Sequence, residues 1–376
     1  MSDRQREISM GEKKLMKGCE ALGEAAIQAG ARAFFGYPIT PQTEVPEYLS
    51  KRLPEVGGVF LQAESEVASS NMLYGAAGAG ARVFTSTSSP GYSLMAEGIS
   101  YIAGSELPAV IINIVRGGPG LGGILPSQGD YHQATKGAGH GDYKNPVLAP
   151  STVQEAADLM MEAFDIADTY RNPVIVMGDG LIGQMMEPVQ FKAPIDPVTL
   201  PKKEWATTGA KNRPPNIINS LYLDAPTLEK HNIKLHAKYE RIQKELRRFE
   251  EYGDDGQVDL LIVAYGTVAR VSKTATDDLI KSGKKVAVFR PITLWPFPDV
   301  ELERRAAKAK RVLVVELSMG QMVDDVKAAV GKEKSVSFFG RGGGSVCSPE
   351  EVRAVAERVL DGEELYVLGD PLKEEA

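Results

Sequence analysis

Short apolar segments alternate with helical segments along most of this sequence, and this alternation limits the fold more than any other feature. The clearest apolar segment, residues 108–115, is interrupted only by Asn113, and shorter ones lie at 58–62, 82–87 and 173–177. Helical segments follow them. Such alternation is typical of a mostly parallel sheet with helices on both faces. The sequence therefore predicts an α/β fold with doubly wound, mostly parallel sheets.

The composition changes twice along the chain, which predicts three parts. Residues 1–190 carry a first run of strands and helices, and residues 257–376 carry a second run. Between them, residues 191–256 begin as a polar, proline-rich connector and end in a charged helix, predicted over 227–252. One apolar stripe runs along that helix, formed by Tyr239, Ile242, Leu246 and Phe249.

Composition argues against several classes of protein. The chain has 376 residues, enough for about two to three domains. The formal charge of −7 and the lack of a basic stripe argue against binding to nucleic acid or to a membrane surface. The sequence has no charged-then-apolar leader and no run of about 18 apolar residues, so we expect a cytoplasmic protein. Cys19 and Cys347 are too few for an iron–sulfur cluster, and the four histidines lack zinc-site spacing, so no metal site is expected here.

Several polar segments follow predicted strands, where ligands bind in doubly wound sheets. In Tyr37-Pro38-Ile39-Thr40-Pro41, two prolines stiffen the turn before a helix predicted over 41–52. Thr40 there either binds an anion, together with the amides at the start of that helix, or only caps the helix. Residues 85–91, a hydroxyl-rich turn that ends in Ser89-Pro90-Gly91, either bind a ligand or form a solvated turn.

Two other strand ends carry charged residues. Glu64 and Glu66 lie in the first turn of a predicted helix, where the helix dipole favours carboxylates without any function. That helix is nearly uncharged, however, and a glutamate at the mouth of a buried helix can share a proton with a heterocycle. Arg116 ends the apolar strand 108–115 and requires a partner. The partner is either a carboxylate of the protein, in a salt bridge, or the carboxylate of a substrate.

Taken together, these segments resemble the alpha subunit of 2-oxoacid:ferredoxin oxidoreductases, of the type that uses 2-oxoisovalerate or 2-oxoglutarate. The resemblance is carried by Tyr37-Pro38-Ile39-Thr40-Pro41, Glu64-Ser65-Glu66, Ser88-Ser89-Pro90-Gly91 and Arg116-Gly117-Gly118-Pro119-Gly120. Residues 294–298 and 315–322 are similar to the second domain of the same family. The resemblance implies a thiamine diphosphate pyrimidine-binding domain followed by a transketolase C-terminal-like domain.

The resemblance also implies roles for individual residues. Glu66 matches the glutamate that hydrogen-bonds N1′ of the cofactor's aminopyrimidine and favours the 4′-imino tautomer, which takes the proton from C2 of the thiazolium. Thr40 and Arg116 match positions that contact the 2-oxoacid carboxylate, so both are expected to be catalytic and substrate-binding residues. Glu64 has no firm counterpart. The other cofactor-binding positions are Tyr37, Pro38, Ile39, Ser89, Pro90 and Gly91.

Two glycine-containing segments are weaker candidates. Residues 340–344 suggest a phosphate loop but lack the Lys-Ser/Thr ending of a P-loop. Gly178-Asp179-Gly180 matches the start of the motif by which thiamine diphosphate enzymes hold magnesium. The asparagine that completes this motif is missing at the required spacing, since Asn212 falls just beyond it. We therefore interpret the segment as a structural turn.

The family's division of labour implies partner subunits. A beta subunit brings the diphosphate and Mg²⁺ site and a [4Fe–4S] cluster, and gamma and ferredoxin-like delta subunits complete a dimer of heteromers. With CoA and ferredoxin, such an enzyme converts a 2-oxoacid to an acyl-CoA, CO₂ and reduced ferredoxin. Three alternatives stay open: specificity for pyruvate or an aryl-2-oxoacid, a transketolase-like transferase subunit, and a non-catalytic assembly protein, which would have no use for Glu66.

Overall fold

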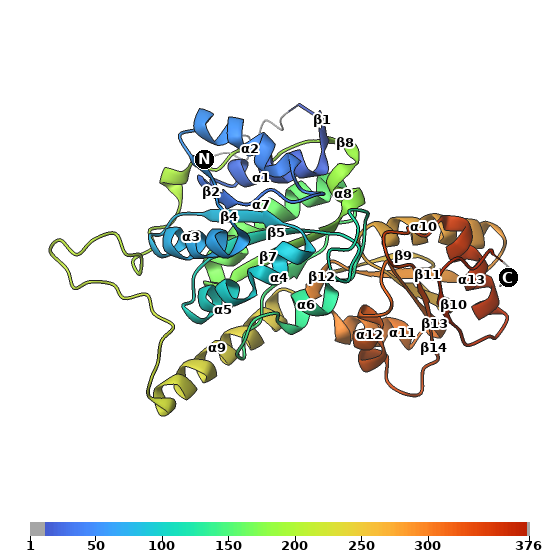
Figure 1. The fold of residues 1–376 in the computed structure, drawn as a ribbon. Helices are drawn as coiled ribbons and strands as arrows, with labels where there is room; N and C mark the ends of the chain where they lie inside the picture. The colour runs from blue at the N-terminus through green and yellow to red at the C-terminus, as the bar shows by residue number, and fades with distance from the viewer. Residues whose placement is uncertain (1–11, 374–376) are drawn as a thin grey trace, which may run out of the picture.

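Two large sheets lie side by side in the computed structural model, which describes residues 12–373, and each sheet is flanked by helices (Figure 1). In spatial order, the strands of the first sheet are β12 (Thr293–Trp295), β6 (Val147–Leu148), β7 (Pro173–Asp179), β5 (Ala109–Val115), β4 (Val83–Thr87), β2 (Ala33–Gly36) and β3 (Val59–Gln62). Those of the second are β15 (Tyr366–Leu368), β14 (Val336–Gly340), β13 (Ala309–Glu316), β10 (Val258–Val263), β11 (Val286–Pro291) and β9 (Phe249–Gly253). All pairs in these sheets are parallel except β12–β6 and β9–β11. The predicted α/β fold is confirmed.

Helices cover both faces of each large sheet (Figure 1). On the first sheet, one face carries α1 (Gly18–Gln28), α2 (Glu44–Glu55) and α7 (Val153–Tyr170), and the other carries α3 (Glu66–Gly78), α4 (Ser89–Leu94), α5 (Ala96–Gly104) and α9 (Ala225–Glu245). On the second sheet, α10 (Gly266–Lys281) packs with α13 (Pro349–Leu360), and α11 (Asp299–Ala306) packs with α12 (Met322–Val330). Two short helices, α6 (Tyr131–Lys136) and α8 (Gly180–Gln184), lie toward the junction of the sheets, and β1 (Lys14–Lys17) pairs with β8 (Met186–Val189).

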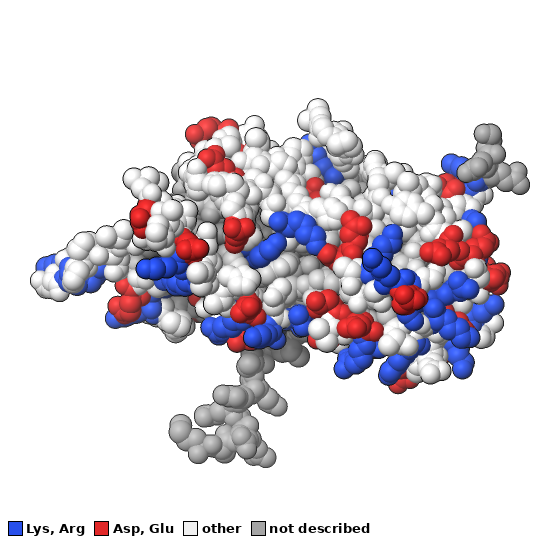
Figure 2. Space-filling model, turned by 90° about the horizontal axis from the view of Figure 1, so that it is seen from below, with Lys and Arg blue, Asp and Glu red and all other residues white. Residues whose placement is uncertain are grey.

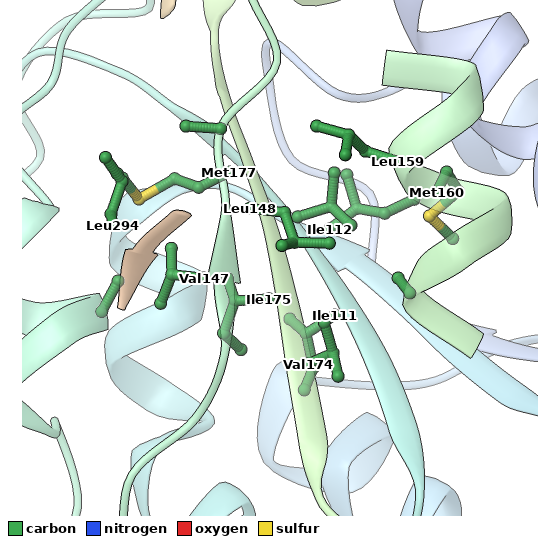
Figure 3. Close-up of a cluster of buried hydrophobic side chains, with 14 of the residues drawn as sticks. Ile111, Ile112, Val147, Leu148, Leu159, Met160, Val174, Ile175, Met177 and Leu294 are labelled. Atoms are coloured by element: carbon green, nitrogen blue, oxygen red, sulfur yellow. The ribbon is translucent and has the colours of Figure 1, made fainter. Parts of the chain in front are cut away.

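Strand β5 forms the centre of the core because all seven of its residues are buried. Ile111 pairs with Ile175 of β7 in the parallel register, and Figure 3 shows these side chains packed among other aliphatic residues. Burial of each such side chain contributes about 1.5–3 kcal/mol to stability. Leu294 of β12 lies beside Met177 at the margin of this cluster (Figure 3). The core of the first sheet therefore includes a strand from the C-terminal half of the chain.

Each large sheet includes a strand from outside its predicted part of the chain, which the sequence did not indicate: β12 joins the first sheet, and β9, from the predicted connector, joins the second. The charged helix ends at Glu245, so the prediction that it continues to residue 252 was wrong. Phe249 instead lies in β9, where its ring stacks on Phe289 at a centroid distance of 5.1 Å. Antiparallel pairing with β11 along Phe249–Gly253 and the packing of Phe249 on Phe289 outweigh the local helical pattern. The division at residues 190 and 257 stays a prediction, and β9 and β12 both pair across it.

The surface has mixed charge, and within residues 12–373 every helix is too short or too polar to cross a membrane. On the face seen in Figure 2, basic and acidic side chains are interspersed and are denser toward the second sheet. The segment between β8 and α9 extends away from the body before it returns to α9 (Figure 1).

Candidate functional site

The structure brings the predicted strand-end segments together at one edge of the first sheet. They follow β2, β3, β4 and β5, which are adjacent and parallel, so their carboxyl ends meet. Tyr37, Pro38 and Ile39 lie in the turn after β2, and Ser89 and Pro90 lie in the first turn of α4. This edge also faces the second sheet.

Glu66 is a buried residue whose carboxylate has no partner in the described part of the chain. It is the first residue of α3, after Ser65, whose hydroxyl accepts a hydrogen bond from the amide of Ala68 at 3.2 Å. Glu66 is 5% exposed, yet its carboxylate makes no hydrogen bond or ion pair within residues 12–373. Glu64, by contrast, is exposed, as expected for a charge at a helix end. A buried unpaired carboxylate is costly unless a ligand supplies the partner.

The position of the Glu66 carboxylate depends on a glycine. A Cβ atom at Gly91 would lie 2.3 Å from Oε1 of Glu66 and 2.2 Å from Oγ1 of Thr87, so a larger residue there would displace these side chains. Oγ1 of Thr87 is itself buried without a hydrogen-bond partner, as are the hydroxyls of Thr85 and Ser88. The end of β4 and the start of α4 thus hold several polar atoms that the described part of the chain leaves unsatisfied.

Arg116 and Thr40 are in direct contact. The Arg116 guanidinium, 8% exposed, donates from Nη1 to the carbonyl oxygen of Thr40 at 2.9 Å and from Nη2 to that of Leu121 at 3.2 Å. Its Nε is buried and has no partner. No carboxylate pairs with Arg116 anywhere in the described chain, so the salt-bridge interpretation was wrong. Neutral carbonyls leave its charge uncompensated, which favours an anionic ligand.

The turn before α2 differs from the prediction. Helix α2 begins at Glu44 and not at Pro41, so Thr40 does not cap it. The Thr40 side chain is exposed. The prediction of an anion site formed by helix amides directly after Thr40 was therefore also wrong. Gln42 stabilises the turn that precedes the helix. Its backbone N donates to Ile39 O at 3.1 Å, and its side-chain Nε2 donates to Tyr37 O at 3.2 Å. Gln42 is fully buried, and the sequence analysis missed its role.

A cavity of about 450 Å³ lies between the two sheets beside Arg116, and we call it the inter-sheet cavity. From the first sheet it is lined by Ser89, Arg116 and Asp130, and from the second by Gln321 and Gly343. The glycine-rich segments 117–120 and 342–343 form much of its wall. The glycine-rich segment after β5 and the candidate loop at 340–344 thus meet at one place.

The loop at 340–344 is nevertheless not a phosphate loop with a free cation. Arg341 forms an ion pair with Glu351 at 2.6 Å and does not line the cavity. Glu351 also completes a capping box with Ser348 at the start of α13. The arginine therefore anchors this helix. This agrees with the sequence, in which residues 340–344 lack the ending of a P-loop.

Several residues that shape the site were missed from the sequence. Gln128 joins the two halves of the chain. Its backbone N donates to Leu317 O at 2.8 Å, its side-chain Oε1 accepts from Leu317 N at 2.9 Å, and its side-chain Nε2 donates to Tyr265 O at 3.0 Å. Glu316 accepts backbone hydrogen bonds from Met322 and nearby residues at the start of α12, and burial raises the pKa of its carboxyl. Glu316 lies in a segment that the family resemblance had included, but Gln128 gave no local signal.

Asp179 has a structural role, in agreement with the interpretation of Gly178-Asp179-Gly180 as a structural turn. Its Oδ1 accepts from the amides of Leu181 and Ile182 at 3.0 and 3.1 Å and from the hydroxyl of Thr267 at 2.9 Å. Burial raises the pKa of this carboxyl. It caps α8 and joins it to α10. Within residues 12–373, no group of three or more His, Cys, Asp or Glu side chains is placed to hold a metal ion.

Comparison with known proteins identifies the family of this chain. Residues 24–251 match the family model described as pyruvate flavodoxin/ferredoxin oxidoreductase, thiamine diphosphate-binding, and residues 258–352 match pyruvate:ferredoxin oxidoreductase core domain II. The chain is 46% identical over 349 residues to the ketoisovalerate oxidoreductase subunit VorB of Methanothermobacter thermautotrophicus, with 93% of this chain and 97% of that one covered. It is 37% identical over 355 residues to the 2-oxoglutarate synthase subunit KorA of Archaeoglobus fulgidus, with 93% and 100% covered.

Solved structures show the same fold. The 2-oxoglutarate:ferredoxin oxidoreductase of Magnetococcus marinus, with 2-oxoglutarate, coenzyme A and succinyl-CoA bound, superposes with a TM-score of 0.81 at 27% identity; the match covers 93% of this chain and 65% of that one. A split-gene transketolase, an inactive beta4 tetramer, gives a TM-score of 0.58 at 15% identity over 92% and 98% of the two chains, which shows the fold alone. The chain therefore belongs to the 2-oxoacid:ferredoxin oxidoreductase family and is an alpha-type subunit.

Proposed function

We propose that this chain is the alpha-type subunit of a thiamine diphosphate-dependent enzyme that converts a 2-oxoacid and CoA to an acyl-CoA, CO₂ and reduced ferredoxin. One observation carries the proposal: Glu66 and Arg116, two buried residues that have no partner of opposite charge within residues 12–373, lie at the same sheet edge. A non-catalytic assembly protein would have no reason to keep either group, because each is costly when left unpaired.

The residues around Glu66 fit the aminopyrimidine of the cofactor. When bound, thiamine diphosphate supplies the nucleophilic carbon and the electron sink for decarboxylation. Glu66 would hold and share a proton with N1′, and Gly91 leaves room for its carboxylate beside Thr87. Tyr37, which is 38% exposed, and Ser89 are placed at the same edge for further contacts. Pro38, Ile39 and Pro90 complete the proposed cofactor-binding residues.

Arg116 and Thr40 would hold the carboxylate of the 2-oxoacid. Donors remain for it because Nε of Arg116 has no partner in the described chain, and Nη1 and Nη2 each keep a second N–H beyond the one that binds a backbone carbonyl. Because this carboxylate leaves as CO₂, it has to be bound firmly but without extra stabilisation of its charge in the transition state. An arginine whose charge is shared with two carbonyls meets both requirements.

The lining of a second cavity favours an aliphatic 2-oxoacid, such as 2-oxoisovalerate, as the substrate. This pocket of about 470 Å³ lies beside Thr40 and is lined by Ile124, Leu125 and Leu181 together with Glu44 and Glu47. It contains no lysine or arginine, so a second carboxylate, as in 2-oxoglutarate, would gain no partner there. The relatives named for ketoisovalerate are 45–46% identical to this chain, against 33–37% for the archaeal 2-oxoglutarate subunits.

The remaining parts of the enzyme would come from other chains. We propose that a beta subunit holds the diphosphate, Mg²⁺ and a [4Fe–4S] cluster, that gamma and ferredoxin-like delta subunits join them, and that the assembly is a cytoplasmic dimer of heteromers. The chain's own two cysteines support this division, since both are buried and far apart in sequence.

The test is an assay of the complex isolated with its partner subunits. The complex is given 2-oxoisovalerate, 2-oxoglutarate, pyruvate or an aryl-2-oxoacid, with CoA and a low-potential electron acceptor. CoA-dependent reduction that is fastest with 2-oxoisovalerate supports the proposal. Aldehyde transfer without any reduction of the acceptor would instead support a transketolase-like transferase.

A further inference from the structure

Asn113 is a buried polar residue within an aliphatic strand. It is the one polar side chain of β5 and is fully buried. Both ends of its amide are used: Oδ1 accepts from the backbone N of Ser89 at 3.2 Å, and Nδ2 donates to Oδ2 of Asp130 at 2.8 Å. An amide buried in a sheet core is tolerated only when it is satisfied in this way. Asn113 therefore links the start of α4 to Asp130.

Asp130 does not act as an ordinary helix cap. It occupies the N-cap position of α6, where an aspartate usually accepts hydrogen bonds from the first amides of the helix. Its side chain makes no such bond and turns toward Asn113 and Ser89 instead. The residue is 8% exposed, and burial raises the pKa of its carboxyl. A capping role thus does not explain an aspartate at this position.

The network continues from Asn113 to Arg116. The hydroxyl of Ser89 accepts a hydrogen bond from the backbone N of Arg116 at 3.1 Å, at the end of β5. Asp130 and Arg116 both line the inter-sheet cavity, and they are the two ionisable side chains among its lining residues. They form no ion pair with each other. Asn113 and Ser89 therefore connect the carboxylate of Asp130 to the backbone of Arg116 by hydrogen bonds.

The same network is tied to the second sheet. Asp130 follows Gln128, which holds Leu317 and Tyr265 through three hydrogen bonds. Nε2 of Gln321 also donates to the carbonyl of Gly129 at 2.7 Å. The position of residues 127–130, and hence of Asp130, thus depends on the C-terminal half of the chain.

We propose that Asp130 is a positioning residue for the 2-oxoacid carboxylate site: through Asn113 and Ser89 it holds the end of β5 so that Arg116 faces the inter-sheet cavity. The proposal rests on the proposed function because it takes Arg116 as the ligand of the substrate carboxylate. It also gives the second half of the chain a part in substrate binding, since that half fixes residues 127–130.

The test uses Asp130→Ala and Asp130→Asn in the complex isolated with its partner subunits. Asp130→Ala removes the acceptor for Asn113 and is expected to raise KM for the 2-oxoacid about tenfold, with kcat within about threefold and KM for CoA unchanged. Asp130→Asn keeps an amide oxygen that can accept from Asn113 and is expected to restore KM to within about twofold. Asp142→Ala, at an exposed aspartate in the loop after α6, serves as the control and is expected to leave kcat and KM for the 2-oxoacid unchanged.

A double-mutant cycle with Arg116→Ala separates this inference from the proposed function. If Asp130 acts through Arg116, then Asp130→Ala adds no further rise in KM when Arg116 is already alanine. An unchanged KM in Asp130→Ala, or a full additional rise in the double variant, overturns the positioning role. If Arg116→Ala alone leaves KM unchanged, the assignment of Arg116 in the proposed function fails instead. Thermal unfolding and size-exclusion chromatography establish that each variant is folded and assembled. If Asp130→Ala does not fold, Asp130→Leu, which keeps the shape of the side chain but offers Asn113 no acceptor, carries the test with the same expected rise in KM.

Discussion

Arg116 donates a hydrogen bond from Nη1 to the carbonyl oxygen of Thr40 at 2.9 Å, and this contact joins two strand ends that are 76 residues apart in the sequence. The guanidinium is thereby held in place before any substrate arrives. Preorganisation of this kind lowers the cost of binding because the side chain has little freedom left to lose. The predictions below follow from this contact and from the residues around it.

Replacement of Glu66 by glutamine should lower turnover at least about 100-fold, because the amide cannot share a proton with the cofactor ring. The complex should stay assembled, since Glu66 makes no hydrogen bond within the described chain. Steady-state kinetics and size-exclusion chromatography measure the two effects. Glu64→Gln, at an exposed carboxylate two residues away, is the matched control. Near-normal activity of Glu66→Gln would remove this residue from the mechanism.

Gly91→Ala should also abolish most activity, because its Cβ would lie 2.3 Å from Oε1 of Glu66 and would displace the carboxylate. We expect a lower affinity of the complex for thiamine diphosphate as well, measured by reconstitution of the cofactor-free complex. Gly75→Ala is the control: it lies within α3, has no atom within 4 Å of an added Cβ, and should stabilise the helix by about 1 kcal/mol. Equal behaviour of the two variants would contradict the packing argument.

Arg116→Ala should lower kcat/KM for the 2-oxoacid about 10- to 100-fold, the usual effect of losing a hydrogen bond to a charged group. The affinity for CoA should not change. Arg270→Ala removes a surface arginine that pairs with Glu187 and should leave the kinetics as they are. The same kinetic constants in Arg116→Ala and the parent enzyme would show that the arginine has only a structural role.

The isolated chain should bind thiamine diphosphate far more weakly than the assembled complex, even with Mg²⁺. No group of metal-ligating side chains exists within residues 12–373, so the diphosphate end lacks its partner here. Isothermal titration calorimetry of the chain and of the complex provides the comparison. Tight stoichiometric binding by the chain alone would argue against a cofactor shared between subunits.

Arg290→Ala should destabilise the contact between the two halves of the chain. Arg290, in β11, is buried and pairs with Glu155 of α7 at 2.7 Å and with Glu250 of β9 at 2.7 Å. Its loss leaves Glu155 without a cation and Glu250 with Lys273 alone, at a cost of about 3 kcal/mol, the low end for a buried pair because both glutamates are partly exposed. Thermal or urea unfolding measures the loss. Arg353→Ala, which removes an exposed i,i+4 pair with Glu357, should change stability by less than about 0.5 kcal/mol.

The sequence alone determined the fold class and the sheet edge at which the candidate site residues lie. Aliphatic strands such as β5 are recognisable because both faces are buried, so their residues are apolar without alternation. The polar segments after β2, β3, β4 and β5 had to meet once those strands were parallel neighbours. Local pattern and chain direction were sufficient for these conclusions.

Only the tertiary structure decided what the site residues contact. Arg116 binds carbonyl groups and no carboxylate, and Asp130 turns from its own helix to Asn113. Phe249 belongs to a strand of the second sheet although its spacing fits a helix. The physical reason is the same in each case: these choices depend on partners that are distant in sequence, and a local pattern contains no information about which distant group will compete best for a buried charge, amide or ring.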